Sequence, residues 1–546
     1  MSLFQKKNLY FIGVAVTMAV GLALRFFRIA TNDFVFFDEG FYLNYHRAFY
    51  DLLTRHFSQN LEDWRHAVSA WFRLSLGSGK ALWFMLADAR FFVGLYRAWY
   101  VPRILAALSG ALTLPLAAWM ARRYFNSKAV GLLTLILLAL LPSHVFYSRI
   151  GLQETTSTLF FLAGFYFYLF PRRFGPRTFL SATLLSAAYF TNYRLIFLPL
   201  HVVVTEFFLS FTEKRSFDVR KVVWHTVVFL AFLVVIGALD QAQNTIVTFS
   251  WMFHQSHLAA DRFVWMNLLS YPYYLFRLEN ILFGLFFFAT FACFFIRNYP
   301  RQHLFPFVLV CFHMGIFTFA AQKGARYIGV ILPFAAMAVA AVIAEAHKRF
   351  DRAFGRVVLW SLVAVMCSFL LAKSVRLSVA RSDYRPAMET LLRQDPEVKV
   401  VASQNYILNL YTSRPDQAVA VPRRFFQLAA LYGAGYRYLI LGPQAYVSLT
   451  DNEKPFSVEL DSYLNVIDKN VAPLRVYDHF NSLVMERFVF EHSEDLGRSI
   501  AFLRRDPAGL GRLRVYDLRA CLREIMIRLN RQRGQPLTGK KEAADG

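Results

Sequence analysis

Long apolar stretches separated by short polar loops make up most of the first 375 residues. A bilayer core is crossed by roughly 20 apolar residues in an α-helix, and this part of the chain predicts about eleven such helices. The predicted spans cover residues 9–29, 101–120, 129–147, 154–170, 178–191, 195–211, 222–240, 279–296, 304–321, 326–345 and 357–373. Residues 178–211 leave two interpretations open, two short helices or one broken hairpin, because the polar turn at 191–194 interrupts them.

Every second connection between these stretches is short and basic. The basic connections carry Lys6-Lys7, Arg122-Arg123-Lys128, Arg172-Arg173-Arg177, Lys214-Arg215-Arg220-Lys221, Arg297-Arg301 and Lys348-Arg349-Arg352-Arg356. Lys and Arg concentrate in cytoplasmic loops, so we expect the N-terminus inside and the C-terminus outside. The first stretch lacks a small-residue cleavage site and is long enough to span the bilayer, so we interpret it as a retained helix rather than a signal peptide.

The pattern changes after the last predicted span. Val398–Ala402, Tyr438–Leu441 and Ser482–Phe490 read as strands, and Phe425–Tyr432 reads as a helix closed by Gly433. An Arg-rich amphipathic stretch, 512–533, follows, and then a polar tail, 540–546, that we expect to be disordered. The amphipathic stretch could lie on anionic headgroups or pack on its own domain.

The predicted architecture is an all-α polytopic membrane domain followed by a small extracytoplasmic α/β domain. The membrane domain covers residues 1–373, with outer loops at 30–98 and 241–277. The α/β domain covers 374–506, and the basic stretch and tail cover 507–546.

Composition and charge narrow the class of protein. Hydrophobic residues make up 56% of the chain and charged residues 18%, which excludes a disordered chain and an ordinary cytosolic enzyme. The net charge is +24, and the first 375 residues hold 35 of the 60 basic side chains but only 16 of the 36 acidic ones. Because the excess belongs to the hydrophobic part, we expect the partner to be a lipid bilayer and not nucleic acid.

Two adjacent carboxylates, Asp38 and Glu39, lie just outside the first predicted helix in an aromatic segment. Burial beside apolar groups raises the pKa of a carboxyl toward the range of a general base. The alternative is structural, since acidic residues also favour helix N-termini.

Further charged groups lie at the same outer side. Glu154 follows Ser148-Arg149, and an Arg149–Glu154 surface pair is its ordinary explanation. The outer basic groups, with a neighbouring tyrosine, are Lys80, Arg194, Lys323, Arg326 and Tyr327. Basic residues in outer loops are unusual for a membrane protein, so they favour an anionic partner such as a lipid phosphate; the alternative is that they snorkel to the interface.

A histidine pair in the second outer loop is a further candidate. His254 and His257, with Arg262, could position a substrate or hold a metal ion. Two histidines three residues apart are a weak indication of a metal site, and an interfacial structural role is the alternative. The sequence requires no cofactor; a divalent metal ion is possible but unsupported.

The order of these motifs resembles the membrane-embedded GT-C glycosyltransferases, specifically the protein O-mannosyltransferase and lipid A aminoarabinose transferase branch (glycosyltransferase families 39 and 83). The matching segments are Asp38-Glu39, Lys80 in place of a Lys-Pro-Pro-Leu segment, Arg103-Ile-Leu-Ala-Ala-Leu-Ser-Gly, Leu141-Pro-Ser-His-Val-Phe-Tyr-Ser-Arg149 with Glu154, and Lys323-Gly-Ala-Arg-Tyr-Ile-Gly-Val-Ile-Leu-Pro333. The resemblance covers roughly residues 9–373. Ala81 and Leu82 stand where the family has two prolines.

The resemblance implies transfer of a sugar from a polyprenyl-phosphate donor on the extracytoplasmic side, with inversion. Separately, we expect a bacterial plasma membrane, because the chain is compact and its soluble domain is small. The resemblance also implies Asp38 as the base toward the acceptor, Glu39 as its neighbour that orients or tunes it, and Glu154 as the second acidic position. It makes the basic groups and Tyr327 candidates for contact with the donor phosphate. A carboxylate that removes a proton and cations that stabilise a leaving phosphate are also what this chemistry needs physically.

Other functions remain open at this point. A lipid or solute transporter would suit the many helices, although transporters usually place ionisable groups at mid-membrane. A scaffold protein of the cell envelope, or a glycan polymerase or ligase with a lipid-diphosphate donor, is also compatible. The donor sugar and the acceptor (protein, glycolipid or glycan) cannot be read from the chain.

Overall fold

The computed structural model describes residues 3–33, 36, 38–40, 42–43, 46, 69, 71, 75, 78–92, 100–170, 175–239, 246, 248–254, 264–412, 414–442, 457–479, 482–491, 493–505 and 512–534. The chain forms two compact units. We call them the membrane unit, which comprises Met1–Asn32, Tyr45–Val379 and Phe490–Gly497, and the sheet unit, which comprises Asp33–Asn44, Ala380–Val489 and Arg498–Gly546.

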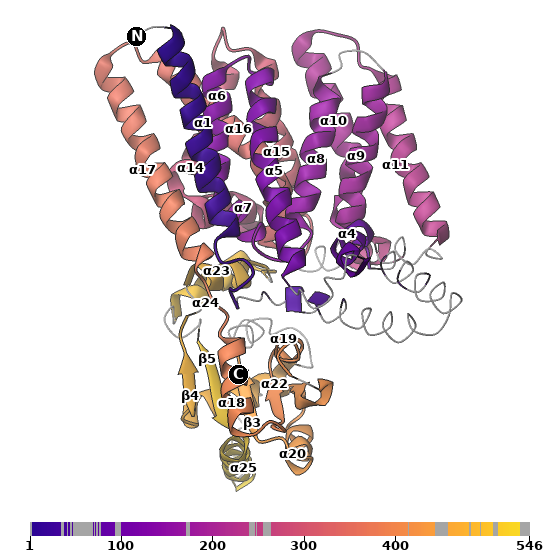
Figure 1. Cartoon of the computed structure of the whole chain (residues 1–546), viewed down its shortest axis with the longest axis vertical. Helices are drawn as coiled ribbons and strands as arrows, with labels where there is room; N and C mark the ends of the chain where they lie inside the picture. The colour runs from indigo at the N-terminus through magenta and orange to yellow at the C-terminus, as the bar shows by residue number, and fades with distance from the viewer. Residues whose placement is uncertain are drawn as a thin grey trace, which may run out of the picture. The chain divides into compact units, whose positions relative to one another are not determined.

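The membrane unit is helical, and its long helices run alongside one another (Figure 1). Its elements are α1 (Leu3–Phe26), α4 (Ala81–Phe92), α5 (Val101–Tyr124), α6 (Lys128–Leu140), α7 (Pro142–Tyr147), α8 (Glu154–Leu169), α9 (Pro176–Thr191), η1 (Tyr193–Phe197), α10 (Leu198–Glu213), α11 (Val219–Leu239), η2 (Trp265–Leu269), α13 (Ser270–Tyr274), η3 (Leu275–Glu279), α14 (Ile281–Ala289), η4 (Thr290–Phe295), η5 (Arg301–Leu304), α15 (Phe305–Thr318), η6 (Ala325–Ile331), α16 (Leu332–Arg349) and α17 (Ala353–Ser378). Each predicted span coincides with one of these helices or a consecutive pair. Among the described residues, six helical stretches are long and apolar enough by themselves to cross a membrane.

Proline marks the start of many of these helices. It occupies the first turn of α5, α7, α9, α10, α15 and α16, where its missing N–H costs no hydrogen bond. Residues 178–211 form two helices, since α9 ends at Thr191 and the side chain of the next residue, Asn192, accepts a hydrogen bond from Arg194 N as η1 begins.

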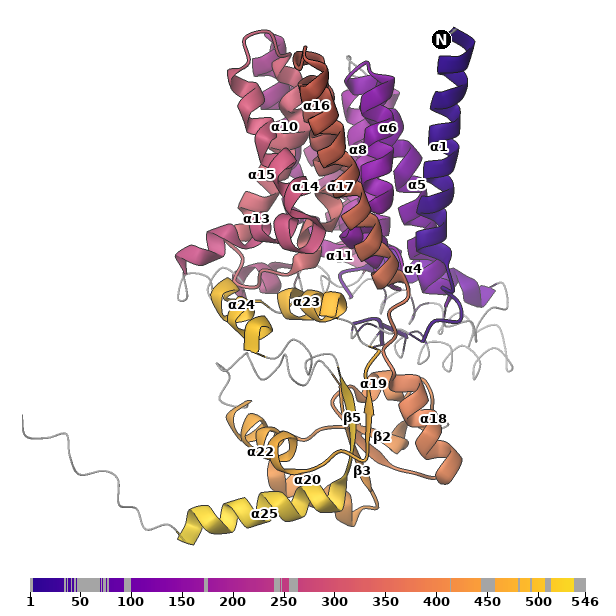
Figure 2. The same ribbon diagram turned by 90° about the vertical axis from the view of Figure 1, so that its left-hand side faces the viewer.

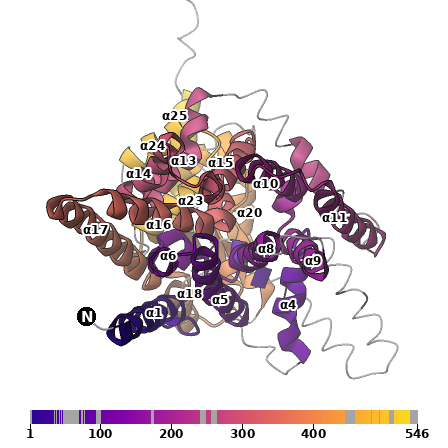
Figure 3. The ribbon, with the colours of Figure 1, turned by 90° about the horizontal axis from the view of Figure 1, so that it is seen from above.

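The core of the membrane unit is built around α16. The apolar stretch of η6 and α16 is 94% buried, and α6 packs between it and α5 (Figure 3). Small side chains allow this close packing: a Cβ on Gly21 of α1 would lie 2.7 Å from Leu114 of α5 and 3.2 Å from Ala139 of α6.

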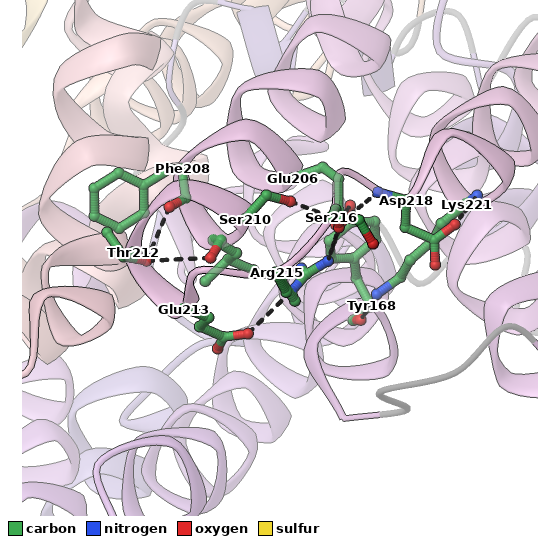
Figure 4. Close-up of polar contacts among 11 residues, drawn as sticks. Tyr168, Glu206, Phe208, Ser210, Thr212, Glu213, Arg215, Ser216, Asp218 and Lys221 are labelled. Atoms are coloured by element: carbon green, nitrogen blue, oxygen red, sulfur yellow. Dashed lines mark hydrogen bonds and ion pairs between the residues drawn. The ribbon is translucent and has the colours of Figure 1, made fainter.

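A polar network fixes the basic loop between α10 and α11 (Figure 4). Glu206 is fully buried, and its carboxylate accepts hydrogen bonds from the Tyr168 hydroxyl at 2.6 Å, from Asp218 N at 3.1 Å and from Arg215. Lys221 donates to the backbone carbonyl of Tyr168 at the end of α8. The buried Glu206 therefore fixes a loop in which the sequence analysis noted only the basic residues.

The sheet unit is an α/β sandwich. Within the described residues its sheet has the order β2 (Ala418–Ala420), β1 (Val400–Ala402), β3 (Tyr438–Leu441), β5 (Leu513–Asp517), β4 (Arg475–Tyr477), with β2, β1 and β3 parallel and β5 antiparallel to both of its neighbours. Figure 2 shows α18 (Tyr384–Gln394) and α19 (Asn405–Leu408) on one face, and α20 (Phe425–Gly433), α22 (Ser457–Asn470) and α25 (Leu518–Gly534) on the other. The predicted small α/β domain is confirmed.

One predicted strand is wrong. Residues 482–490 belong to a helix, α23 (Ser482–Glu491), and α24 (Leu496–Arg505) follows it. Its valines and phenylalanines are typical of strands. Because residues 483–491 are all buried, the segment has no solvent-exposed polar face from which a helical or a strand period could be recognised.

The domain boundaries also differ from the prediction. The stretch 512–533 is not separate from the α/β domain, because it supplies β5 between β3 and β4 and then α25 on the sheet. Asp33–Asn44, placed by sequence in the membrane domain, belongs to the sheet unit, and α17 continues to Ser378. The polar tail at 540–546 lies outside the described residues.

Candidate functional site

The carboxylate pair opens a short helical turn in the sheet unit. Residues 38–40 are helical. The buried Glu39 accepts a hydrogen bond from Phe36 N at 3.2 Å, and Gly40 N donates to the carbonyl of Phe36 at 3.1 Å. This is half of a capping box, in which an acid in the first turn satisfies the N-cap amide. Glu39 therefore shapes the turn, while Asp38 beside it is partly exposed.

A glycine packs this turn tightly against the rest of the sheet unit. A Cβ on Gly40 would lie 2.5 Å from the Ile407 side chain and 3.0 Å from that of Tyr406. Any larger residue at position 40 would push the turn away from α19, and the carboxylates would move with it.

Three predicted residues from distant parts of the sequence meet in the membrane unit. Glu154 Oε1 lies 3.8 Å from Arg326 Nη1 and 4.0 Å from Arg194 Nη1. The side chains are buried, with exposed fractions of 3% for Glu154, 7% for Arg326 and 8% for Arg194. These separations exceed a hydrogen bond, so the three groups interact by charge alone.

Each of the three residues is placed at the start of a helical element. Glu154 is the first residue of α8, Arg194 lies in η1 directly after its Asn192 cap, and Arg326 lies in η6, which leads into α16. The N-terminal ends of helices carry partial positive charge. Together with two guanidinium groups they make this region attractive to an anion.

A fourth charged group, Glu491 at the end of α23, completes the cluster. Its Oε2 lies 3.2 Å from Arg326 Nε, and its Oε1 accepts a hydrogen bond from the Tyr147 hydroxyl. Burial raises the pKa of the Glu491 carboxyl to about 7, although Arg326 and the Tyr147 hydroxyl act to lower it. The sequence analysis assigned residues 482–490 to a strand and did not select Glu491 as a site residue. In the helix that the structure shows, Glu491 lies on the same face as Val484 and Phe488.

Several polar atoms of the cluster are left without hydrogen bonds. Within the described residues, neither carboxylate oxygen of Glu154 has a hydrogen-bond partner, and the same is true of Nε and Nη1 of Arg194. Buried polar atoms are nearly always hydrogen-bonded in native proteins, because leaving them unpaired is costly. The arrangement is typical of a site that receives a polar ligand.

An aromatic side chain joins this cluster to an apolar cavity. The Arg194 guanidinium lies 4.8 Å from the centre of the Tyr327 ring, and the Tyr327 hydroxyl donates to Gln322 Oε1 at 3.1 Å. Tyr327 also packs on Trp251 and Phe317. Trp251 and Phe317 line a cavity of about 370 Å³ together with Phe197, Phe249, Met252, Phe253, Ile316, Phe319 and Ala320.

Lys80 adjoins the same region through its neighbour. Gly79 has a left-handed backbone, with φ +71°, and its carbonyl accepts a hydrogen bond from Tyr193 N at 3.1 Å. A Cβ there would lie 2.9 Å from the Tyr193 ring. The glycine thus lets the backbone at Lys80 come directly against the turn that carries Arg194.

Two other basic residues act as caps for helix C-termini. Lys323 is buried, and its ammonium donates to the carbonyls of Thr318, at 2.8 Å, and Ala320 at the end of α15. Burial lowers its pKa to about 8. The Arg149 guanidinium donates to carbonyls at the ends of α1 and α17 and not to Glu154 as the sequence interpretation of a surface pair has it.

The histidine loop is only partly described. His254 is exposed at the end of the helical residues 248–254, while His257 and Arg262 lie outside the described residues. Among the residues that the structure does describe, no group of three or more His, Cys, Asp or Glu side chains could hold a metal ion.

Comparison with solved structures identifies a similar fold. The crystal structure of ArnT from Cupriavidus metallidurans in the apo state matches with a TM-score of 0.53 at 15% sequence identity, over 82% of this chain and 95% of that chain. The same protein bound to undecaprenyl phosphate matches with a TM-score of 0.49 at 14% identity, over 81% and 95%. No family model and no curated protein sequence matches the chain.

At this identity the similarity concerns the fold, and the fold agrees with the one predicted from the sequence. The order of the helices, the small C-terminal sheet and the match to ArnT over most of both chains point the same way. The chain is a multi-pass membrane protein that shares the fold of ArnT.

Proposed function

We propose that this protein is a membrane glycosyltransferase that moves a sugar from a polyprenyl-phosphate donor to an extracytoplasmic acceptor. The observation that carries the proposal is the buried pair of guanidinium groups, Arg194 and Arg326, beside an apolar cavity of about 370 Å³. A charged head and an apolar chain are the two parts of a polyprenyl phosphate. The site offers a matching surface for each.

The phosphate of the donor would bind at the two arginines. Guanidinium groups bind phosphate oxygens through paired N–H donors, and Arg194 has buried N–H groups that no described residue accepts. Lys80, next to the Arg194 turn, is a third cation for the same phosphate. Lys323 is a weaker candidate, because its ammonium is engaged by backbone carbonyls.

The prenyl chain would lie in the aromatic cavity. Tyr327 lies between the two parts of the site, since its ring contacts both Arg194 and Trp251. Burial of apolar surface contributes roughly 25 cal/mol per Å², so a chain of several isoprene units in this cavity would provide much of the donor affinity.

The chemistry we propose is a single inverting displacement. The base, Asp38, takes the proton of the acceptor hydroxyl as its oxygen bonds to the anomeric carbon, and the bond from that carbon to the phosphate oxygen breaks. The phosphate leaves with the electron pair. Arg194 and Arg326 stabilise the charge that develops on it, a contribution that is typically among the largest in such reactions.

We further propose that the protein lies in a bacterial plasma membrane with its N-terminus in the cytoplasm. The support for the orientation is that the basic loops all lie on the same side of the predicted topology as the N-terminus. The support for a bacterial plasma membrane is the compact chain with its small soluble domain. In this orientation the sheet unit and the carboxylate turn face the extracytoplasmic space, where the acceptor would be found.

The proposal is tested by transfer from a radiolabelled pool of polyprenyl-phosphate sugars in membranes. Wild type is compared with Asp38→Asn at matched expression, and donor binding is measured separately. We expect the amide to abolish transfer and leave donor binding intact. Equal transfer by both proteins would exclude Asp38 as the base, and no transfer by the wild type from any pool would favour the transporter interpretation.

A further inference from the structure

Four buried charges of the membrane unit form a cluster with no formal net charge. Arg194 and Arg326 are cationic, and Glu154 and Glu491 are acidic; all lie within one compact unit. Glu491 is the member that comes from the C-terminal part of the chain, and its exposed fraction is 0%. It contacts Arg326 at Nε, whereas Glu154 lies nearest to Nη1 of the same guanidinium.

A phosphate monoester disturbs this balance. It carries between one and two negative charges near neutral pH, with a second pKa of about 6. Adding its dianion to a neutral buried cluster leaves one uncompensated negative charge even with Lys80 as a third cation, and such a charge is costly in a region from which water is excluded. The cost disappears if one of the two carboxylates becomes neutral.

The surroundings of Glu491 make it the group that can do so. The charged and titratable side chains that face it from the elements packed against it are Tyr147 of α7, Glu154 of α8, Arg194 of η1, Tyr271 and Tyr274 of α13, and Arg326 and Tyr327 of η6. Burial opposes its charge, the nearby Glu154 opposes it too, and only the two arginines and one phenol favour it. Its carboxyl has a pKa of about 7, so a proton is available to it at physiological pH.

We propose that Glu491 is a positioning residue that takes up one proton when a phosphate monoester binds between Arg194 and Arg326. The proton comes from solution, adds to the Glu491 carboxylate and returns to solution when the phosphate leaves. The neutral carboxyl no longer offsets the positive charge of Arg326. The Arg326 guanidinium then attracts the phosphate more strongly. The proposal rests on the proposed function, because it assumes that this site receives a lipid phosphate.

The test is binding of geranylgeranyl phosphate, a short polyprenyl phosphate, to the full chain in detergent. Calorimetry at pH 8 in two buffers of different ionisation heat gives the number of protons taken up. The probe is a dianion at that pH in every sample, so its own titration cancels between variants. We expect about one proton for the wild type, and an affinity that falls about tenfold for each pH unit above about 7.

Two variants separate this role from a merely structural one. Glu491→Gln is neutral at every pH, so its affinity should be independent of pH from 7 to 9 and about tenfold higher than that of the wild type at pH 8. Tyr147→Phe removes the hydrogen bond that favours the charged form, so the fall in affinity should begin at higher pH. As a control, Glu345→Gln removes an outlying carboxylate of α16 that pairs with Arg349, and its pH dependence should match the wild type.

The outcomes are distinct. If the wild type binds the probe and Glu491→Gln shows the same proton uptake and the same pH dependence, the role of Glu491 is refuted while the phosphate site stands. If the wild type binds no probe at any pH, both the phosphate site and this inference fail. A weaker, still pH-dependent Glu491→Gln would likewise contradict the inference.

Discussion

The Tyr147 hydroxyl donates a hydrogen bond to the Glu491 carboxylate across 344 positions of the chain. Tyr147 ends a short helix of the membrane unit, and Glu491 ends α23 in the C-terminal region. Gln322 strengthens the same junction, since its Nε2 donates to the Glu491 carbonyl at 2.9 Å. The charged site is therefore complete only when residues 490–497 lie within the membrane unit.

Arg326 is expected to be the more important of the two site arginines, because it contacts both carboxylates. Replacing it by Gln should lower sugar transfer by about 10²- to 10³-fold, the usual cost of losing one group that stabilises developing charge. Arg326→Lys keeps the charge but loses the planar guanidinium group, so its rate of sugar transfer should lie between those of the wild type and Arg326→Gln. Transfer in membranes at matched expression is the measurement, with Arg349→Gln as a control; wild-type transfer by Arg326→Gln would remove this residue from the mechanism.

Glu39 and Asp38 should behave differently although they are adjacent. Glu39→Gln keeps an oxygen that accepts from Phe36 N, so transfer should stay within a few-fold of wild type. Glu39→Ala loses that hydrogen bond and should reduce the free energy of unfolding by about 1 kcal/mol. The measurements are transfer and thermal unfolding, and a folded Glu39→Gln protein without activity would show that Glu39 takes part in the chemistry.

Glu491 should make the stability of the protein depend on pH. Its carboxyl pKa rises from an ordinary 4.5 to about 7 on folding, so the folded state binds the proton more tightly than the unfolded one. The stabilisation that this provides is fully present below pH 4.5 and is lost as the pH rises through 7. It amounts to on the order of 3 kcal/mol.

The comparison for this prediction is Glu491→Gln, which cannot titrate. Thermal unfolding of the full chain in detergent, followed from pH 5 to pH 8, should show the wild type losing stability relative to the variant. Parallel curves for the two proteins would mean that Glu491 has an ordinary pKa.

Substitutions in the Glu206 network of Figure 4 should lower the stability of the protein without lowering sugar transfer per folded molecule. Glu206→Gln removes the charge that Arg215 and the Tyr168 hydroxyl bind and should cost about 1–3 kcal/mol of unfolding free energy. Glu213→Gln, at the exposed partner of the same arginine, should cost less than about 1 kcal/mol. Transfer per folded molecule should be unchanged in both, and a selective loss of transfer in Glu206→Gln would indicate coupling to the site.

The membrane fold could be predicted because a helix that crosses a bilayer needs about 20 consecutive apolar residues, a pattern that is easily recognised in a sequence. Apolar length gave the spans, and three distant residues singled out by charge, Glu154, Arg194 and Arg326, meet in the structure. An ionisable side chain near apolar spans is expensive, so its presence is informative even without knowledge of its partners.

The other features of the site could not be predicted, because they depend on tertiary contacts that produce no periodic pattern in the sequence. α23 is buried on every side, so its pattern shows neither a helix nor a strand, and Glu491 could not be placed. Lys323 and Glu39 were chosen for their charge, but backbone groups that no pattern reveals determine their contacts: carbonyls for Lys323 and the Phe36 amide for Glu39.

The position of β5 has a consequence for how the protein is made. Leu513–Asp517 lies between β3 and β4, and β4 pairs with β5 within the described residues of the sheet. The sheet therefore cannot be completed until nearly the whole chain has been synthesised, long after the residues of the first membrane helices. A chain that stops before residue 513 leaves the β3 edge without its β5 partner, and an open sheet edge of this kind promotes pairing with other chains.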